Sequence, residues 1–144
     1  MSETTPRAVF ERLSQGISAG RWHDLADLYA EDAVVEQPLV STAPGRIEGR
    51  ETIRAHFAGA AAMGLRLVAR DVVIHETADP EVVVAEFTYE ITGREGTTTA
   101  ANIQVLRVRD GLITATRDYH DHLAIARVTG GLPALLAAAG GAAA

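Results

Sequence analysis

The chain has 144 residues, with 13 basic and 19 acidic side chains, a net charge of −6 and no cysteine. The length suits one domain with its own core, and the missing thiols exclude disulfide scaffolds, thiolate metal sites and cysteine nucleophiles. All the basic residues are arginine, which excludes a Schiff-base lysine and a phosphate-loop lysine, and the acidic balance argues against a nucleic-acid partner.

A helix is predicted near the start of the chain. Thr5 is a typical N-cap residue, Pro6 suits the first helical turn, and Gly20 is a typical stop. Between them, apolar side chains recur at the spacing of one helix face: Phe10, Leu13 and Ile17.

Further elements are predicted before residue 65. An apolar stripe that begins at Trp22 and includes Tyr29 indicates a second short helical segment, which ends near residue 32. Ile53 and Phe57 share one face of a later helix. The elements expected after the stripe are a short strand at 33–37, a loop at 38–49 and the helix at 51–63.

From residue 65 the pattern becomes that of strands. Runs rich in β-branched residues are separated by typical turn sequences, among them Asp79-Pro80 and Asp110-Gly111. The chain beyond residue 130 is rich in alanine and is expected to form a weak helix or a frayed tail. The predicted strands span 65–76, 82–92, 97–108 and 112–122.

Alternation along the strands predicts which side chains share a face. In 82–92 one set carries the charges, so the other set, with Phe87 and Tyr89, should point inward. Asn102 and Gln104 share a face of the next strand with alanine and leucine. The last strand places these residues on one face: Thr114, Thr116, Asp118, His120 and, at its end, His122.

Helices followed by a meander of strands predict an α+β fold. One curled antiparallel sheet should pack its concave face against the N-terminal helices and leave a cavity between them, where ligands usually bind. We expect a single domain over 1–144, with a core at about 6–125 and a C-terminal tail at 126–144.

Three segments carry a resemblance to a known superfamily. Residues 19–35, 49–57 and 110–121 resemble nuclear transport factor 2-like proteins, and the last segment is similar to the SnoaL-like and limonene-epoxide-hydrolase-like branches. The resemblance covers about 6–125. It implies a cystatin-like, cone-shaped α+β fold, usually dimeric, that hosts isomerases, hydrolases, cyclases and non-catalytic binders.

The resemblance also bears on the catalytic residues. The base of ketosteroid-isomerase-like members would fall at Gln37, and the first aspartate of the epoxide-hydrolase-like members at Phe87, so neither carboxylate is kept. The second aspartate survives as Asp118. The resemblance implies that Asp118 points inward, and alternation then turns His120, Asn102 and Gln104 inward as well.

Asp118 and His120 are the predicted catalytic pair. At i and i+2 of a strand, their Cβ atoms lie about 7 Å apart, so the two groups can share a water or a substrate and exchange roles as acid and base. A structural acceptor role for Asp118 and a half-exposed position for His120 are the alternatives. The residues predicted to bind substrate are Gln37, Phe87, Tyr89, Asn102, Gln104 and Thr116.

Asp118, His120 and His122 also have a spacing seen among metal ligands, but no second element clearly joins them, so we expect no metal and no other cofactor. His56 is assigned to packing or to the surface.

The leading functional hypothesis is a cofactor-free enzyme that performs acid–base chemistry on a small, apolar, oxygenated substrate, by cyclisation, isomerisation or epoxide opening. The alternatives are a non-catalytic binding protein for a hydrophobic ligand and a dimerisation module. We expect a homodimer formed through the sheet, without nucleic-acid or membrane partners. No apolar run is typical of a signal peptide or a membrane span, which favours a cytoplasmic location.

Overall fold

The computed structural model describes residues 2–40 and 45–141. Within these residues the chain forms the short 3₁₀ helices η1 (Ser2–Thr4) and η2 (Trp22–Leu28) in addition to four α-helices and six strands. The α-helices are α1 (Pro6–Ser18), α2 (Arg50–Ala62), α3 (His122–Thr129) and α4 (Leu132–Gly141). The strands are β1 (Tyr29–Glu36), β2 (Arg46–Glu48), β3 (Arg66–Glu76), β4 (Val82–Gly93), β5 (Gly96–Arg109) and β6 (Leu112–Tyr119).

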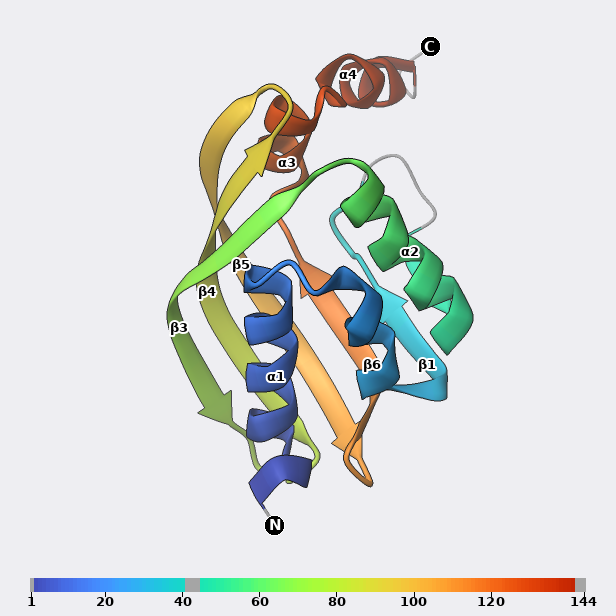
Figure 1. Ribbon diagram of the computed structural model, residues 1–144, viewed down its shortest axis with the longest axis vertical. Helices are drawn as coiled ribbons and strands as arrows, with labels where there is room; N and C mark the ends of the chain where they lie inside the picture. The colour runs from blue at the N-terminus through green and yellow to red at the C-terminus, as the bar shows by residue number, and fades with distance from the viewer. Residues whose placement is uncertain (1, 41–44, 142–144) are drawn as a thin grey trace.

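The strands form one sheet in the order β2-β1-β6-β5-β4-β3. The sheet curls around α1, η2 and α2, which cover one of its faces, while α3 and α4 lie at the end of the molecule where the chain finishes (Figure 1). This arrangement confirms the predicted α+β cone. It differs from the expected all-antiparallel sheet in one pairing, because β1 runs parallel to β6.

Local sequence signals explain several element ends. The Thr5 hydroxyl caps α1 by accepting from the Ala8 amide, and Pro6 stands at the first position of the helix. Asp110 and Gly111 both have positive φ angles, as the predicted tight hairpin turn between β5 and β6 requires. These parts of the fold follow from the residues themselves.

Three predicted boundaries were wrong. The strand expected at 33–37 begins at Tyr29. The helical segment that begins at Trp22 ends at Leu28 rather than near residue 32, because Tyr29 already pairs with Ile113 of β6. The last strand ends at Tyr119 rather than at 122, because the Asp121 carboxylate caps a new helix by accepting from the Ala124 amide. The predicted loop 38–49 contains β2, and its residues 41–44 lie outside the described chain.

The predicted inward faces of β4 and β5 are confirmed. On β6, Thr116 and Asp118 are buried as predicted, but Ile113 rather than Thr114 is buried at the start of the strand, where the pairing with β5 shifts register. On β4 the buried set runs from Val83 to Ile91 in alternation, and on β5 it includes Asn102 and Gln104. The core between the sheet and the helices is apolar, with Phe10 of α1 packed on Phe87 at a ring-centroid distance of 5.8 Å. In the described part of the chain, no helix combines the length and the apolar character that crossing a membrane requires.

Candidate active site

A cavity of about 440 Å³ lies between the concave face of the sheet, η2 and α2. Most of its wall is apolar and comes from α1, η2, α2 and β3. Its polar groups are few and converge from several elements: Tyr29, Gln37, His56, Tyr89, Gln104, Asp118, His120 and His122. An apolar cavity with a small number of polar groups is typical of a small-molecule site.

Strand register brings Asp118 and Gln104 together. The two residues are direct partners in the antiparallel β5–β6 pair, so their side chains leave the same face of the sheet. The Gln104 amide donates from Nε2 to Oδ1 of Asp118 at 2.8 Å, and both residues are at least 92% buried, with exposed fractions of 7% and 8%. One carboxylate oxygen is therefore held in place, while the other can act on a ligand.

Asn102 sets the orientation of His120. The Asn102 amide donates from Nδ2 to the Ala100 carbonyl at 2.9 Å, so its Oδ1 is the atom that faces Nδ1 of His120, also at 2.9 Å. Because an amide oxygen only accepts, His120 must carry its proton on Nδ1. The second ring nitrogen of neutral His120, Nε2, is then an unprotonated base.

Nε2 of His120 and Oδ2 of Asp118 are 3.8 Å apart, too far for a direct hydrogen bond. No described residue donates a hydrogen bond to Oδ2. Two acceptor atoms thus lie side by side at the cavity, and together they can take up one proton. Burial lowers the pKa of His120, and the nearby Asp118 opposes that effect. The ring is therefore neutral, and able to accept a proton, at neutral pH.

The two cavity tyrosines are suited to donate hydrogen bonds. Burial, together with the negative charge of Asp118, raises the pKa of Tyr89 and of Tyr29 well above the ordinary value. Both phenols therefore keep their protons throughout the physiological range. Such neutral O–H groups can stabilise negative charge that develops on a substrate oxygen.

The structure separates the predicted site residues into two groups. Asp118, His120, Gln37, Tyr89 and Gln104 line the cavity. Three others do not belong to the lining residues: Phe87, Asn102 and Thr116. Phe87 is packed in the core, and Asn102 accepts the hydrogen bond from Nδ1 of His120. The buried Oγ1 of Thr116 has no hydrogen-bond partner in the described chain.

Gln37 reaches the cavity through the one parallel pairing of the sheet. Val35 lies opposite Thr116 and Glu36 opposite Arg117, so the chain direction carries the next residue, Gln37, alongside Asp118. Position 37, which the resemblance places at the base of ketosteroid-isomerase-like members, is thus a neutral amide next to the retained carboxylate.

His56 and Tyr29 are cavity residues that the sequence analysis missed. His56 comes from α2 and is exposed, but partial desolvation lowers its pKa, and Asp118 opposes the shift. A signal existed, since His56 is three residues after Ile53 and adjacent to Phe57, on the inward face of the helix. Within residues 2–40 and 45–141 no group of three or more His, Cys, Asp or Glu side chains is arranged to hold a metal ion.

Comparison with known proteins places the chain in a family. The profile of the SnoaL-like domain matches residues 10–116. The chain belongs to the SnoaL-like family. It is 36% identical over 130 residues to an uncharacterised PhzA/B-like protein of Pseudomonas aeruginosa, with 85% of this chain and 86% of that protein covered. The family match confirms the resemblance to the SnoaL-like branch that the sequence analysis identified.

Solved structures share this SnoaL-like fold. A Bacillus subtilis protein assigned provisionally as an isomerase superposes with a TM-score of 0.80 and 25% identity, over 88% of this chain and 93% of its own. A Xanthomonas campestris protein assigned provisionally as a polyketide cyclase superposes with a TM-score of 0.72, over 86% and 96% of the two chains. At 18% identity, the second likeness shows the fold alone.

Removing the amide that holds His120 tests the tautomer argument. Asn102→Leu leaves a buried Nδ1–H without an acceptor, which should lower the free energy of unfolding by about 1–3 kcal/mol. Long-range ¹H–¹⁵N spectra of the wild type should show His120 protonated on Nδ1, and the variant should lose that preference. An Nε2-protonated ring in the wild type would contradict the assignment.

Acidification should destabilise the protein through its cavity histidines. Burial lowers the pKa values of His56, His120 and His122 below the ordinary value of 6.5. Between the folded and unfolded pKa values the unfolded chain binds more protons, so the free energy of unfolding should fall as the pH drops through 6.5. Urea midpoints measured from about pH 8 to about pH 5 check this expectation. In the triple variant His56→Gln, His120→Gln, His122→Gln the urea midpoint should depend less on pH. A pH dependence equal to that of the wild type would contradict the prediction.

Proposed function

We propose that this SnoaL-like protein is a cofactor-free enzyme that moves a proton on a small, apolar, oxygenated substrate, in a cyclisation or an isomerisation. The observation that supports the proposal most strongly is the pair of neighbouring acceptor atoms, Oδ2 of Asp118 and Nε2 of His120, at an otherwise apolar cavity. The family membership and the names given to proteins of similar fold are in keeping with this class of reaction.

The proton-transfer step would use the pair as one base. Nε2 of His120 accepts a proton from a carbon or a hydroxyl of the substrate, and the Asp118 carboxylate stabilises the imidazolium that forms. Gln104 holds Asp118, and Asn102 holds His120, so neither side chain has to reorient during the reaction. The charge left on the substrate oxygen would be stabilised by the O–H of Tyr89 or Tyr29.

Return of the proton completes an isomerisation or a ring closure. The imidazolium of His120 can give its proton back at a second substrate atom, which regenerates the neutral ring. His56 approaches the same cavity from α2 rather than from the sheet, and the N–H of its neutral ring can donate a hydrogen bond to a substrate oxygen. A substrate held from that wall can receive the proton back from His120 at a second atom.

The test uses a substrate that requires only a base. Ring opening of 5-nitrobenzisoxazole begins with removal of the C3 proton; the N–O bond then breaks, its electrons go to oxygen, and a coloured cyanophenolate forms. We expect saturable turnover, faster than with free imidazole at the same concentration. A rate equal to that of free imidazole would contradict the proposal.

The second candidate is a non-catalytic binding protein for a hydrophobic ligand. It is favoured by the mostly apolar wall of the cavity and by the absence of the other family carboxylates at Gln37 and Phe87. Trp22 is the only tryptophan and lines the cavity, so quenching of its fluorescence by 5-nitrobenzisoxazole reports binding. Saturable quenching without turnover would favour this candidate over the enzyme.

A further inference from the structure

The cavity opens to solvent along α2. Most of its lining residues are buried or half-buried, but four of the described ones are exposed, and all four belong to this helix: Ala55, His56, Gly59 and Met63. Residues that line a cavity and are also exposed mark the place where the cavity reaches solvent. These four residues therefore form the rim of the opening.

The rim lies on a flank of α2, beside the face that packs in the core. Phe57 of the core face packs on Trp22 and Tyr29 at ring-centroid distances of 6.2 and 6.0 Å. Gly59 and Met63 follow one helical turn apart on the neighbouring flank. Because the core contacts of Phe57 hold the helix in place, the width of the opening depends on the side chains of the rim.

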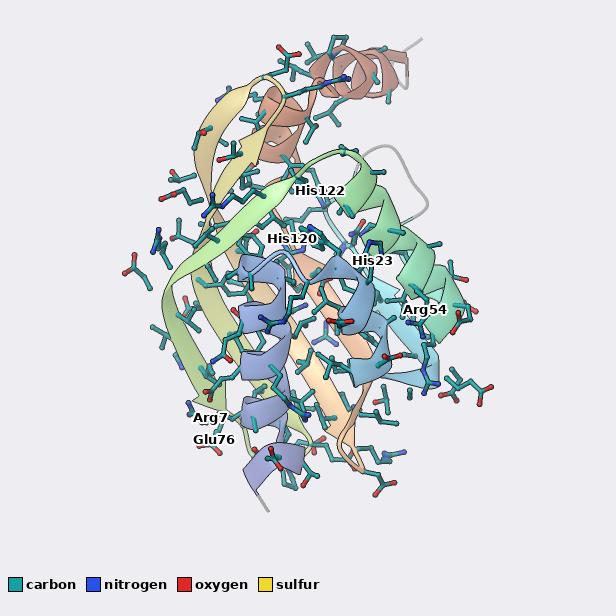
Figure 2. All side chains as sticks on the ribbon, in the orientation of Figure 1. Arg7, His23, Arg54, Glu76, His120 and His122 are labelled. Atoms are coloured by element: carbon teal, nitrogen blue, oxygen red, sulfur yellow. The ribbon has the colours of Figure 1, made fainter. Side chains whose placement is uncertain are left out.

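The opening leads to the acid–base pair. Burial lowers the pKa of His56, and the negative charge of Asp118 opposes that shift, so this rim residue lies within electrostatic range of the pair. Asp118 is only 8% exposed, and its Oδ2 accepts no hydrogen bond from a described residue. His120 lies toward the end of α2 that leads into β3, where the cavity also reaches Met63 (Figure 2). A ligand with a polar group at Asp118 can therefore extend to the rim.

Gly59 is in the interior of α2, at a position where no contact requires a glycine. A Cβ built there meets no atom within 4 Å, whereas a Cβ at Gly16 of α1 would strike the side chain of Leu25. After proline, glycine is the least favourable residue in the interior of a helix. The free space in front of Gly59 belongs to the opening, so a group of the ligand can lie against the backbone of α2 there.

We infer that the substrate carries a broad apolar group that lies in the opening against Gly59, while its polar end meets Asp118 and His120. The inference rests on the proposed function, because the polar end must reach that pair. Gly59 then determines which substrates fit, since a larger side chain would occupy the place of the apolar group. Met63, which is 55% exposed and has a flexible side chain, adapts the rim to that group.

Phenol and 4-phenylphenol separate the two ends of such a ligand. The O–H of either compound can donate to the Asp118–His120 acceptors, but only 4-phenylphenol has a second ring that can reach the opening. Binding to the full chain is measured by calorimetry. We expect the wild type to bind 4-phenylphenol about tenfold or more tightly than phenol, because the second ring buries apolar surface at the rim.

The variant Gly59→Leu tests the opening without altering the acid–base pair. We expect it to bind phenol as the wild type does and to lose most of the gain from the second ring. The matched control is Ala58→Leu, which places the same side chain on the next residue of α2; Ala58 is exposed and does not line the cavity. This control should keep the full gain.

The outcomes separate the inference from the proposed function. Equal affinity of the wild type for the two phenols, or a gain that persists in Gly59→Leu, would overturn the inference. The same loss of gain in Ala58→Leu would also overturn it, because the effect would not come from the rim. Failure of both phenols to bind the wild type would overturn the inference as well, and turnover of 5-nitrobenzisoxazole then decides separately whether the proposed function stands.

Discussion

Asp118→Asn and His120→Gln are each expected to lower kcat/KM for ring opening of 5-nitrobenzisoxazole by about 10²–10⁴-fold, the usual contribution of a positioned general base. Asn at position 118 can still accept from Gln104, and Gln at position 120 can still donate to Asn102, so both variants should fold. Each variant removes one of the two acceptor atoms at the cavity. Steady-state kinetics with the purified proteins measure the effect.

The double variant distinguishes a shared base from two independent groups. If Oδ2 and Nε2 take up a single proton between them, Asp118→Asn with His120→Gln should be no slower than the worse single variant. His75→Gln is the matched control, since His75 lies on β3, pairs with Glu86 and does not line the cavity. Wild-type kcat/KM in either single variant would contradict the assignment, and additive losses would contradict a shared proton.

Gly93→Ala is expected to lower the free energy of unfolding by about 3 kcal/mol, the upper part of the range for overpacking. A Cβ at position 93 would lie on the carbonyl oxygen of Val128, well inside van der Waals contact. That carbonyl belongs to the backbone of α3 and accepts a hydrogen bond from the Glu95 amide, so it cannot move without separating α3 from the hairpin. Urea denaturation measures the loss.

Gly59→Ala is the matched control for this prediction. A Cβ at position 59 of α2 meets no atom within 4 Å, and the residue is inside a helix. Alanine there should raise the free energy of unfolding by about 0.4–1 kcal/mol, because it reduces the freedom of the unfolded chain. Equal stability of the two variants would show that α3 does not depend on its contact with the hairpin.

The part of the fold that depends on local pattern is predictable from the sequence. The buried alternation through Phe87 and Tyr89, the Thr5 cap and the turn at Asp110-Gly111 are each encoded within a few residues. The parallel pairing of β1 with β6 joins segments about 80 residues apart, and no local signal specifies its direction. The place of Gln37 beside Asp118 depends on that pairing.

In the candidate site, too, some features follow from local sequence pattern and others depend on long-range packing. Alternation from Asp118 predicts that Gln104, Asn102 and His120 share a face, and the hydrogen bonds among them agree with it. The end of β6 depends on competition between the strand and the Asp121 cap, which a strand pattern alone does not resolve. His56 was missed because a polar residue on a helix is usually exposed, although its spacing from Ile53 and Phe57 placed it on the face of α2 that packs over the cavity.

The central claim is that one proton moves to and from the Asp118–His120 pair, and the pH dependence of kcat/KM for 5-nitrobenzisoxazole tests it most directly. Because burial lowers the pKa of His120, the account predicts an acid limb with a single midpoint below 6.5, absent from His120→Gln. A midpoint at or above 6.5, or the same acid limb in His120→Gln, would contradict the account.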